Sequence, residues 1–333
     1  MHTPRPLLLD TDPGGDDIVA LLWLQSLVHQ GWAELVAVTT AAGNVSAEQT
    51  FRAACQVLEL GGLATVPVGF GVPVRGGAIA DAAHIHGADG LGNLSQTLPT
   101  PGRSPATAPA ADDLLIESIR AAPGDLTVIA IGPLTNLAAA EAKQPGLLRQ
   151  AREVVIMGGA FGTAGNVTPQ AEFNIAFNPE AARAVFAACH SLVVLPLDIT
   201  RQLLCRPEMM RALTPKQPGS AIAPFLVALT DFLTETAGRY RETRGDAGFL
   251  VHDAATVAYL FYPEVLRFRR ARIQVETQGE FTTGQTLLDG RHGPKPAAQA
   301  WVACQVDAEQ LLACLLADLR TLIAAENRGL EQP

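Results

Sequence analysis

The chain lacks the short motifs that mark several large enzyme classes. Its 333 residues contain no G-x-x-x-x-G-K, no G-x-G-x-x-G, no G-x-S-x-G and no H-E-x-x-H. These motifs respectively cradle nucleotide phosphates, bind dinucleotides, carry a serine nucleophile and bind zinc. The glycines of residues 158–162 follow a predicted strand but do not have the dinucleotide spacing. The sequence therefore disfavours a nucleotide triphosphatase, a nicotinamide enzyme, a serine hydrolase and a zinc protease.

Paired cysteines, excess positive charge and long apolar runs are also missing. The five cysteines form no C-x-x-C pair, and their odd number and wide spacing favour buried thiols in a reducing compartment over a disulfide framework. The net charge of −9 argues against a nucleic-acid backbone as partner. The N-terminus lacks the basic and apolar regions of a signal peptide, and no run of about 18 apolar residues predicts a membrane span. We therefore expect a cytoplasmic protein that does not contact a membrane.

The chain does contain a regular alternation of apolar, strand-like runs with helical segments. The predicted strands are residues 7–9, 35–40, 126–131, 154–157 and 192–197. The predicted helices include one that begins near residue 18 and others at residues 47–60, 134–143, 179–188 and 308–326. Continuous apolar strands that alternate with helices favour an α/β fold, with a mainly parallel central sheet flanked by helices. No long linker divides the chain, so we expect residues 1–333 to form one domain.

Three segments depart from this simple alternation. Residues 99–111 are rich in proline and alanine, which predicts a surface connection. Residues 209–260 are mostly helical in pattern, with a glycine-containing interruption at residues 244–248. Residues 272–289 alternate in polarity, which predicts a late β-hairpin.

Four carboxylates occupy eight residues near the N-terminus, in the segment D-T-D-P-G-G-D-D. Asp10 and Asp12 follow the first predicted strand, and Asp16 and Asp17 precede the first predicted helix. In open α/β sheets, ligand sites form at this carboxyl end of the strands. One aspartate would suffice to cap the helix, whereas four would repel one another unless a cation or hydrogen-bond donors compensated. The spacing is not that of an EF-hand, and the cluster predicts a site for a hard divalent cation.

Four further segments place polar side chains where predicted strands end or helices begin. They contain Asn44, His86, the group Asn166, Glu172 and Asn174, and the pair His252 and Asp253. Each has an ordinary alternative role, because asparagine after glycine forms turns, aspartate caps helices and polar side chains lie on solvated loops. Taken together, their carboxylates, amides and imidazoles suit a polyhydroxylated ligand such as a sugar.

These segments belong to blocks that resemble the nucleoside hydrolase family, in particular its inosine-uridine preferring members. The blocks are D-T-D-P-G-G-D-D (10–17), A-A-G-N-V (41–45), H-G-A-D-G-L-G (86–92), I-G-P-L-T-N-L (131–137), M-G-G (157–159), G-N-V-T-P-Q-A-E-F-N-I (165–175), L-D-I-T (197–200) and V-H-D-A (251–254). They cover nearly the whole chain in order. The resemblance implies Ca²⁺-dependent hydrolysis of the N-glycosidic bond of ribonucleosides to ribose and free base.

The resemblance also implies a Ca²⁺ site at the bottom of the pocket. Its ligands would be the side chains of Asp12, Asp17 and Asp253 and the carbonyl oxygen of Ile131. Asp16 would lie beside the ion and accept hydrogen bonds from the sugar. Asp10 would support the turn from behind.

The substrate contacts implied by the resemblance come from several blocks. The ribose hydroxyls would be held by Asn44, Asn166, Glu172 and Asn174, with Phe173 among the substrate-binding residues of the same block. His86 and His252 would lie near the sugar and the base, and Tyr240 would flank the base.

The chemistry of the reaction fits these roles. Cleavage of a glycosidic bond develops positive charge on the sugar ring, and carboxylate and amide oxygens stabilise that charge in a dry pocket. A bound cation lowers the pKa of a water molecule. The best candidate to accept the proton of that water is Asp12, as general base. His252 is the candidate acid for the departing base, because an unperturbed imidazole titrates near pH 6.5.

Several alternatives stay open at this point. Arg201 follows L-D-I-T where many relatives carry histidine, which would fit a changed surface or base preference. The three tryptophans lie outside the pocket segments, so no tryptophan sandwich around the base is expected. The alternative functions are hydrolysis of a modified nucleoside or other N-riboside, and non-catalytic riboside binding. A phosphatase that uses Asp10 and Asp12 is disfavoured, because no later lysine and acidic pair accompany them. A homodimer or homotetramer is expected from the resemblance.

Overall fold

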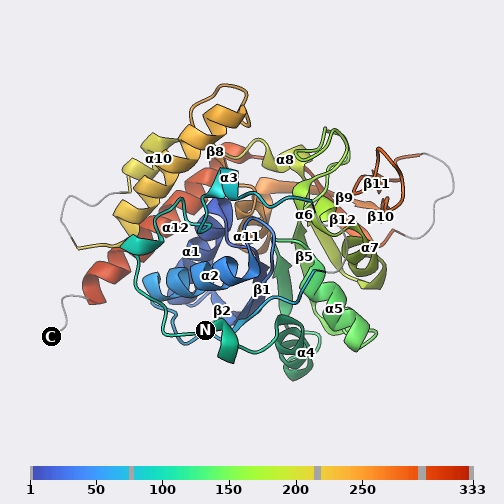
Figure 1. Ribbon diagram of the computed structural model, residues 1–333, viewed down its shortest axis with the longest axis horizontal. Coiled ribbons are helices and arrows are strands. Elements are labelled where there is room, and N and C mark those ends of the chain that lie inside the picture. The colour runs from blue at the N-terminus through green and yellow to red at the C-terminus, as the bar shows by residue number, and fades with distance from the viewer. Residues whose placement is uncertain (1–2, 75–78, 214–218, 292–297, 330–333) are drawn as a thin grey trace.

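The computed structural model describes residues 3–74, 79–213, 219–291 and 298–329, and its centre is an eight-stranded sheet (Figure 1). The strand order is β3-β2-β1-β4-β5-β6-β12-β9. The strands are β1 (Arg5–Thr11), β2 (Ala33–Thr40), β3 (Val68–Gly69), β4 (Thr127–Ala130), β5 (Glu153–Met157), β6 (Leu192–Leu195), β9 (Leu266–Ala271) and β12 (Ala300–Val306). All neighbouring pairs are parallel except β12 and β9. The predicted mainly parallel α/β sheet is confirmed.

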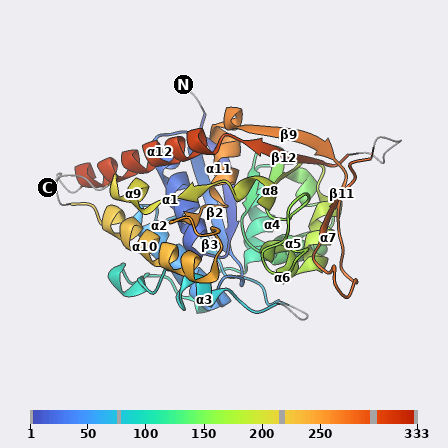
Figure 2. The same cartoon turned by 90° about the horizontal axis from the view of Figure 1, so that it is seen from above.

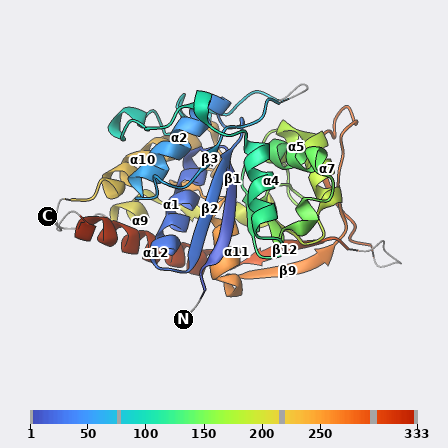
Figure 3. The same cartoon turned by 90° about the horizontal axis from the view of Figure 1, so that it is seen from below.

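Helices cover both faces of this sheet (Figures 1 and 3). One face carries α1 (Gly15–His29), α2 (Ala47–Leu60), α10 (Ile222–Tyr240), α11 (Ala254–Phe261) and α12 (Ala308–Gly329). The other carries α4 (Ala111–Ala121), α5 (Thr135–Lys143) and α7 (Pro179–Ala188). Because side chains alternate along a strand, Leu7 and Leu9 of β1 enter the first core and Leu8 enters the second.

Shorter elements complete the fold. They are the helices α3 (Ala83–His86), α6 (Phe173–Phe177), α8 (Leu197–Thr200) and α9 (Pro207–Arg211), and the strands β7 (Leu204–Cys205), β8 (Phe249–Leu250), β10 (Ile273–Val275) and β11 (Thr286–Leu288). Turns of 3₁₀ helix lie at Ser95–Thr97, Pro105–Thr107, Leu148–Gln150 and Pro263–Val265. The antiparallel pair of β10 and β11 confirms the predicted late hairpin.

Helix α1 is apolar on all sides because it is buried on all sides. Its residues from Ile18 to Leu27 are all buried, and α12 packs along it. Asp318 of α12 is 6% exposed and accepts hydrogen bonds from Trp23 Nε1 at 2.7 Å, Tyr262 Oη at 2.6 Å and Gln30 Nε2 at 2.9 Å. The bonds to Trp23 and Gln30 join the last helix to the middle and the end of α1, and the bond to Tyr262 joins it to the residue that follows α11.

The structure corrects some details of the predicted elements. The strand predicted at residues 192–197 ends at Leu195, because Pro196 cannot donate to a neighbouring strand and α8 begins directly after it. The segment 209–260 is interrupted by β8, which pairs with β7. The long antiparallel pair of β9 and β12 was not predicted (Figure 2). Residues 214–218 of that helical segment lie outside the described residues.

The structure also shows how far each cysteine is buried and whether a helix could span a membrane. The prediction of buried thiols is right for Cys55, Cys189 and Cys205, but wrong for Cys304, which is exposed, and for Cys314, which is half-buried. Among the described residues, none of the helices has the length and the apolar character that crossing a bilayer requires.

The Asp318 contacts generate a stability prediction. Asp318→Ala should lower the free energy of unfolding by about 2 to 4 kcal/mol, because it removes the partner of the buried Trp23 Nε1–H and of the half-buried Tyr262 hydroxyl. Urea unfolding followed by circular dichroism measures this. The control is Arg320→Ala, an exposed position on the same helix, which should change stability by less than about 0.5 kcal/mol. Equal effects of the two substitutions would contradict the role given to Asp318.

Candidate active site

A cavity of about 1280 Å³ opens at the carboxyl ends of the parallel strands. Its walls come from the segments that follow β1, β2, β4, β5 and β6, and from residues near the ends of α10 and β8. Most of the predicted site residues line it: Asp16, Asp17, Asn44, His86, Ile131, Asn166, Glu172, Phe173, Asn174, Tyr240, His252 and Asp253. Asp10 and Asp12 are not among its lining residues.

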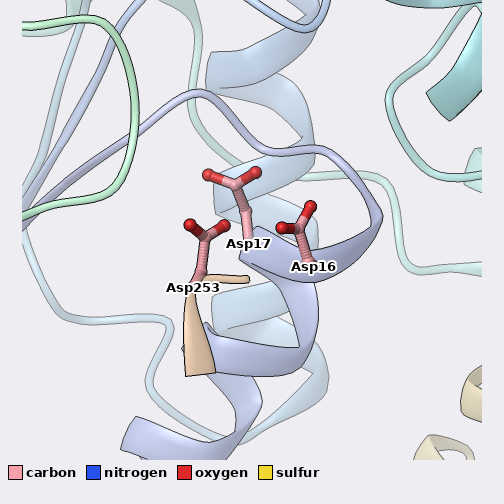
Figure 4. A group of neighbouring side chains, drawn as sticks. All are labelled: Asp16, Asp17 and Asp253. Carbon is pink, nitrogen blue, oxygen red and sulfur yellow. The ribbon is translucent and has the colours of Figure 1, made fainter. Parts of the chain in front are cut away.

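Three carboxylates meet in this cavity (Figure 4). Asp16 and Asp17 lie in the first turn of α1, and Asp253 immediately precedes α11. One ligand-capable oxygen from each lies within 4.8 Å of the others. The acids of the N-terminal signature and an acid near the opposite end of the chain therefore share one small volume.

Asp17 is oriented by a full set of donors. Its Oδ1 accepts from Thr11 Oγ1 at 2.6 Å and from the Asp12 backbone N–H at 3.2 Å. Its Oδ2 accepts from the Gly14 backbone N–H and from Asn44 Nδ2, both at 3.1 Å. The bond from Gly14 also caps the N-terminus of α1. Asp17 is therefore both a helix-capping residue and a member of the acidic cluster.

Asp12 does not belong to the group of three and is not among the residues that line the cavity. Its Oδ2 accepts from the Asn44 backbone N–H at 2.7 Å, whereas its buried Oδ1 has no hydrogen-bond partner. Gly43 and Gly132 approach the carboxylate so closely that a Cβ on either would lie 2.0 or 2.4 Å from one of its oxygens. Both glycines are thus required by the space that the Asp12 carboxylate occupies, and its role as ligand and base stays a prediction.

Asp10 lies behind the turn and is fully buried. Its Oδ1 accepts from Thr39 Oγ1 at 2.6 Å and from Asn136 Nδ2 at 2.7 Å, and Asn136 also donates to the Thr40 carbonyl. Burial raises the pKa of Asp10 to about 7. This carboxyl joins β1, β2 and α5 under the site.

The acidic cluster is electrostatically costly as it stands. Burial, followed by the Asp17 carboxylate, raises the pKa of Asp16 to about 8, and burial raises the pKa of Asp17 to about 6. Burial and the nearest carboxylates also raise the pKa of Asp12 and of Asp253 well above the usual range. Buried carboxylates with an unpartnered oxygen among them form a donor set that fits a hard divalent cation.

The predicted ribose side of the cavity is built from helix and strand ends. Glu172 caps α6: its oxygens accept from the backbone N–H groups of Gly159, Asn174 and Ile175 at 2.8 to 3.2 Å. The Asn174 amide donates to the Ile131 carbonyl at 2.9 Å and to the Met157 carbonyl at 3.2 Å. Ile131 thus lines the cavity, and its carbonyl oxygen accepts a hydrogen bond from Asn174, another lining residue.

The loop that carries Asn166 is fastened by Asp198, which the sequence analysis did not single out, and by Arg201, which it named only for its departure from many relatives. Asp198 of α8 accepts from the backbone N–H groups of Phe161 and Gly162 at 2.9 and 2.6 Å. Arg201 donates to Thr163 Oγ1 at 2.9 Å and to the Gly165 carbonyl at 2.8 Å. Asp198 lies within the L-D-I-T block, as does Thr200, and this block was the sequence signal that could have pointed to both residues.

Asn166 itself is exposed, and its Oδ1 accepts from the Phe173 backbone N–H at 2.9 Å. The Phe173 ring lies 5.6 Å from that of Phe177 and is half-buried. Tyr240 is 46% exposed at the cavity wall, and its ring lies 4.9 Å from that of His84. These residues form the more open part of the cavity.

Both predicted histidines use Nδ1 for a contact inside the protein. His86 Nδ1 accepts from the Gly15 backbone N–H at 2.9 Å, and His252 Nδ1 lies 2.7 Å from Thr200 Oγ1. Burial lowers the pKa of His86 to about 4, and burial together with the Arg201 charge lowers the pKa of His252 to about 3. The neutral imidazole is the favoured form of each at pH 7.

Comparison with known proteins shows which family the chain is similar to. A model of the family described as inosine-uridine preferring nucleoside hydrolase matches residues 7–313. An inosine-uridine preferring nucleoside hydrolase of Leishmania major is 35% identical over 320 residues, which cover 95% of this chain and 97% of that protein. A pyrimidine-specific ribonucleoside hydrolase of Escherichia coli is 35% identical over 292 residues, which cover 86% of this chain and 87% of that protein.

A solved structure gives the same result for the fold. The purine-preferring ribonucleoside hydrolase from Gardnerella vaginalis superposes with a TM-score of 0.85 at 29% identity. The superposition covers 96% of this chain and 100% of that one.

The raised pKa values generate a prediction for the metal-free protein. Asp16 and Asp17 have folded pKa values of about 8 and 6, above the 3.8 of an unperturbed aspartate, so the folded state binds more protons than the unfolded state between these values. Their contribution to stability is therefore full below about pH 4 and is lost as the pH rises towards about 8. In EDTA, the Tm should fall between about pH 5 and about pH 8, and Ca²⁺ should raise it more at the higher pH.

Calorimetry at the two pH values measures both effects. Asp16→Asn should flatten the pH dependence of the metal-free protein, whereas Asp231→Asn, at an exposed position, should leave it unchanged. If the Tm of the metal-free protein did not depend on pH, the raised pKa values of Asp16 and Asp17 would be contradicted.

Proposed function

Because the chain belongs to the inosine-uridine preferring nucleoside hydrolase family, we propose that it hydrolyses the N-glycosidic bond of ribonucleosides in a Ca²⁺-dependent reaction. The products are ribose and the free base. The observation that carries the proposal is the convergence of Asp16, Asp17 and Asp253 at a cavity that Asn44, Glu172 and Asn174 also line. That combination of oxygens suits one cation and one sugar.

The proposed cation ligands are the side chains of Asp12, Asp17 and Asp253 and the Ile131 carbonyl. Support comes from the donor set: buried carboxylates of raised pKa, and an Asp12 Oδ1 that no protein group satisfies. When bound, a divalent cation lowers the pKa of a water molecule and balances the negative charge of these acids.

We assign the role of general base to Asp12. Its Oδ2 is held by the Asn44 backbone, so its Oδ1 is the oxygen left to accept a proton from the attacking water. Gly43 and Gly132 leave the space that the carboxylate occupies, because a Cβ at either position would overlap one of its oxygens. Asp10 supports this turn through Thr39 and Asn136.

The ribose is proposed to lie between Asp16 and the amides. Asp16, Asn44, Asn166, Glu172 and Asn174 would hold its hydroxyls through hydrogen bonds. Positive charge develops on the ring as the bond to the base breaks, and the nearby carboxylates stabilise it more strongly where water is excluded. Burial of Asn44, Glu172 and Asn174 supports such a water-poor site.

The base is proposed to lie towards His86, His252, Phe173 and Tyr240. The lowered pKa of both histidines favours neutral imidazoles, so we assign them hydrogen-bond donation to the departing base rather than the work of an imidazolium acid. The relatives bear names with different base preferences, so a panel of substrates decides which bases this chain accepts.

We further propose that residues 1–333 act as one catalytic domain that assembles into a homodimer or homotetramer. Strands from both ends of the chain share the central sheet, which supports a single domain. Light scattering coupled to size exclusion measures the oligomeric state.

The central prediction is base release. Metal-replete protein should release free base from at least one of inosine, adenosine, guanosine, uridine and cytidine, as measured by chromatography with kcat/KM for each. Activity should disappear with EGTA and return with Ca²⁺. Wild-type activity that survives thorough chelation would refute the metal role, and tight nucleoside binding without turnover would favour a riboside-binding protein instead.

A second prediction concerns Asp12. Asp12→Ala should lower kcat by about 10³ or more, because it removes the base and a cation ligand together. Asp12→Asn keeps the shape of the side chain and should also lower kcat. The amount of Ca²⁺ bound to this variant, measured by atomic absorption, separates the role of general base from the role of cation ligand. Asp125→Asn, at an exposed position, is the control and should keep wild-type kcat. A nearly active Asp12→Ala would remove Asp12 from the mechanism.

A further inference from the structure

Thr200 makes a single side-chain hydrogen bond within the described residues, and its partner is His252. Thr200 ends α8 and is fully buried. Its Oγ1 lies 2.7 Å from His252 Nδ1. Within the described part of the chain, the Thr200 hydroxyl has no other hydrogen-bond partner, and neither does the His252 ring.

The direction of this hydrogen bond follows from the hydroxyl. If Nδ1 carried a proton and donated it to Oγ1, the hydroxyl hydrogen of Thr200 would be buried without an acceptor. Buried donors are rarely left in that state, because desolvation is then uncompensated. Donation from the hydroxyl to Nδ1 satisfies both groups, and it corresponds to an unprotonated Nδ1 and a neutral ring whose proton is on Nε2.

We propose that Thr200 is a positioning residue that holds His252 as the Nε2–H tautomer, so that the ring donates a hydrogen bond to the departing base. This inference rests on the proposed function. His252 lines the cavity, and Nε2 is the ring nitrogen left for a ligand.

The second histidine of the cavity supports the same arrangement. A backbone N–H can only donate, so the bond from Gly15 N to His86 Nδ1 places the proton of the neutral His86 ring on Nε2 as well. The peptide N–H of Gly15 fixes the tautomer of His86, and the Thr200 hydroxyl fixes that of His252. Both tautomers carry the proton on Nε2. The cavity thus offers two imidazole N–H donors.

This arrangement specifies the atoms of the base that the histidines contact. When the glycosidic bond breaks, its electron pair stays on the base, whose ring nitrogens and carbonyl oxygens become stronger acceptors. Neutral imidazoles that donate through Nε2 stabilise this charge without giving up their proton. We therefore expect the two histidines to contact acceptor atoms of the base and not its amino groups.

The first test observes the tautomer directly. Long-range ¹H–¹⁵N spectra of the Ca²⁺-loaded full chain report which nitrogen of each histidine carries the proton, and His252→Gln assigns the signal among the seven histidines. The wild type and Thr200→Ser should show a protonated Nε2 and an unprotonated Nδ1 for His252. Thr200→Val, which keeps the volume but removes the hydroxyl, should lose this preference. A protonated Nδ1 in the wild type, or an unchanged spectrum in Thr200→Val, would overturn the proposal.

The second test separates positioning of the base donor from a merely structural role. Thr200→Val should lower kcat for the best nucleoside by about tenfold, and Thr200→Ser should restore it. Hydrolysis of p-nitrophenyl β-D-ribofuranoside should fall much less, because its leaving group departs as a stable anion. Equal losses for both substrates would overturn the proposal.

A matched control guards against a general effect of removing a buried hydroxyl. Thr230 of α10 is 1% exposed and its Oγ1 has no hydrogen-bond partner, so Thr230→Val should leave spectra and kinetics unchanged. A wild type that hydrolyses no riboside would refute the proposed function alone, because the spectra still decide the role of Thr200.

Discussion

The concentration of negative charge in a nearly dry volume is the constraint on which the rest of this structure depends. Asp12, Asp16, Asp17 and Asp253 are brought together where burial raises the pKa of each of them. Such a group persists in a folded protein only if donors or a cation compensate. Asp17 has four donors, whereas Asp12 retains an oxygen with none. The Asp12 oxygen that has no hydrogen-bond donor makes the site suited to a metal ion.

The fold supplies the donors from elements that also hold the protein together. The turn before α1 caps the helix with Asp17 and presents the same carboxylate to the cavity. Helix α1 is in turn fixed by its burial and by the bonds from Asp318 of α12. The first and last helices therefore pack together, although they lie at different ends of the sequence.

On the other side of the cavity, residues of the short helix α8 make hydrogen bonds to two parts of the wall. Asp198 fastens the loop that leads to Asn166 and Glu172, and Thr200 contacts His252 on the segment before α11. Arg201 adds two more bonds to the same loop. The loop that carries Asn166 and the segment that carries His252 are thus both hydrogen-bonded to the same short helix, which follows β6.

Local pattern in the sequence determined the buried strands, most helices, the late hairpin and the acidic segment, because each depends on neighbouring residues. It did not reveal the β9–β12 pair, in which the exposed positions of β9 are arginines, or the contacts of Thr200 and Asp198. The meeting of Asp16 and Asp17 with Asp253, the absence of Asp12 from the cavity lining and the pairing of Asn174 with the Ile131 carbonyl were decided by tertiary structure alone. The physical reason is that distances between segments far apart in the chain depend on strand order and packing, which no short stretch of residues encodes.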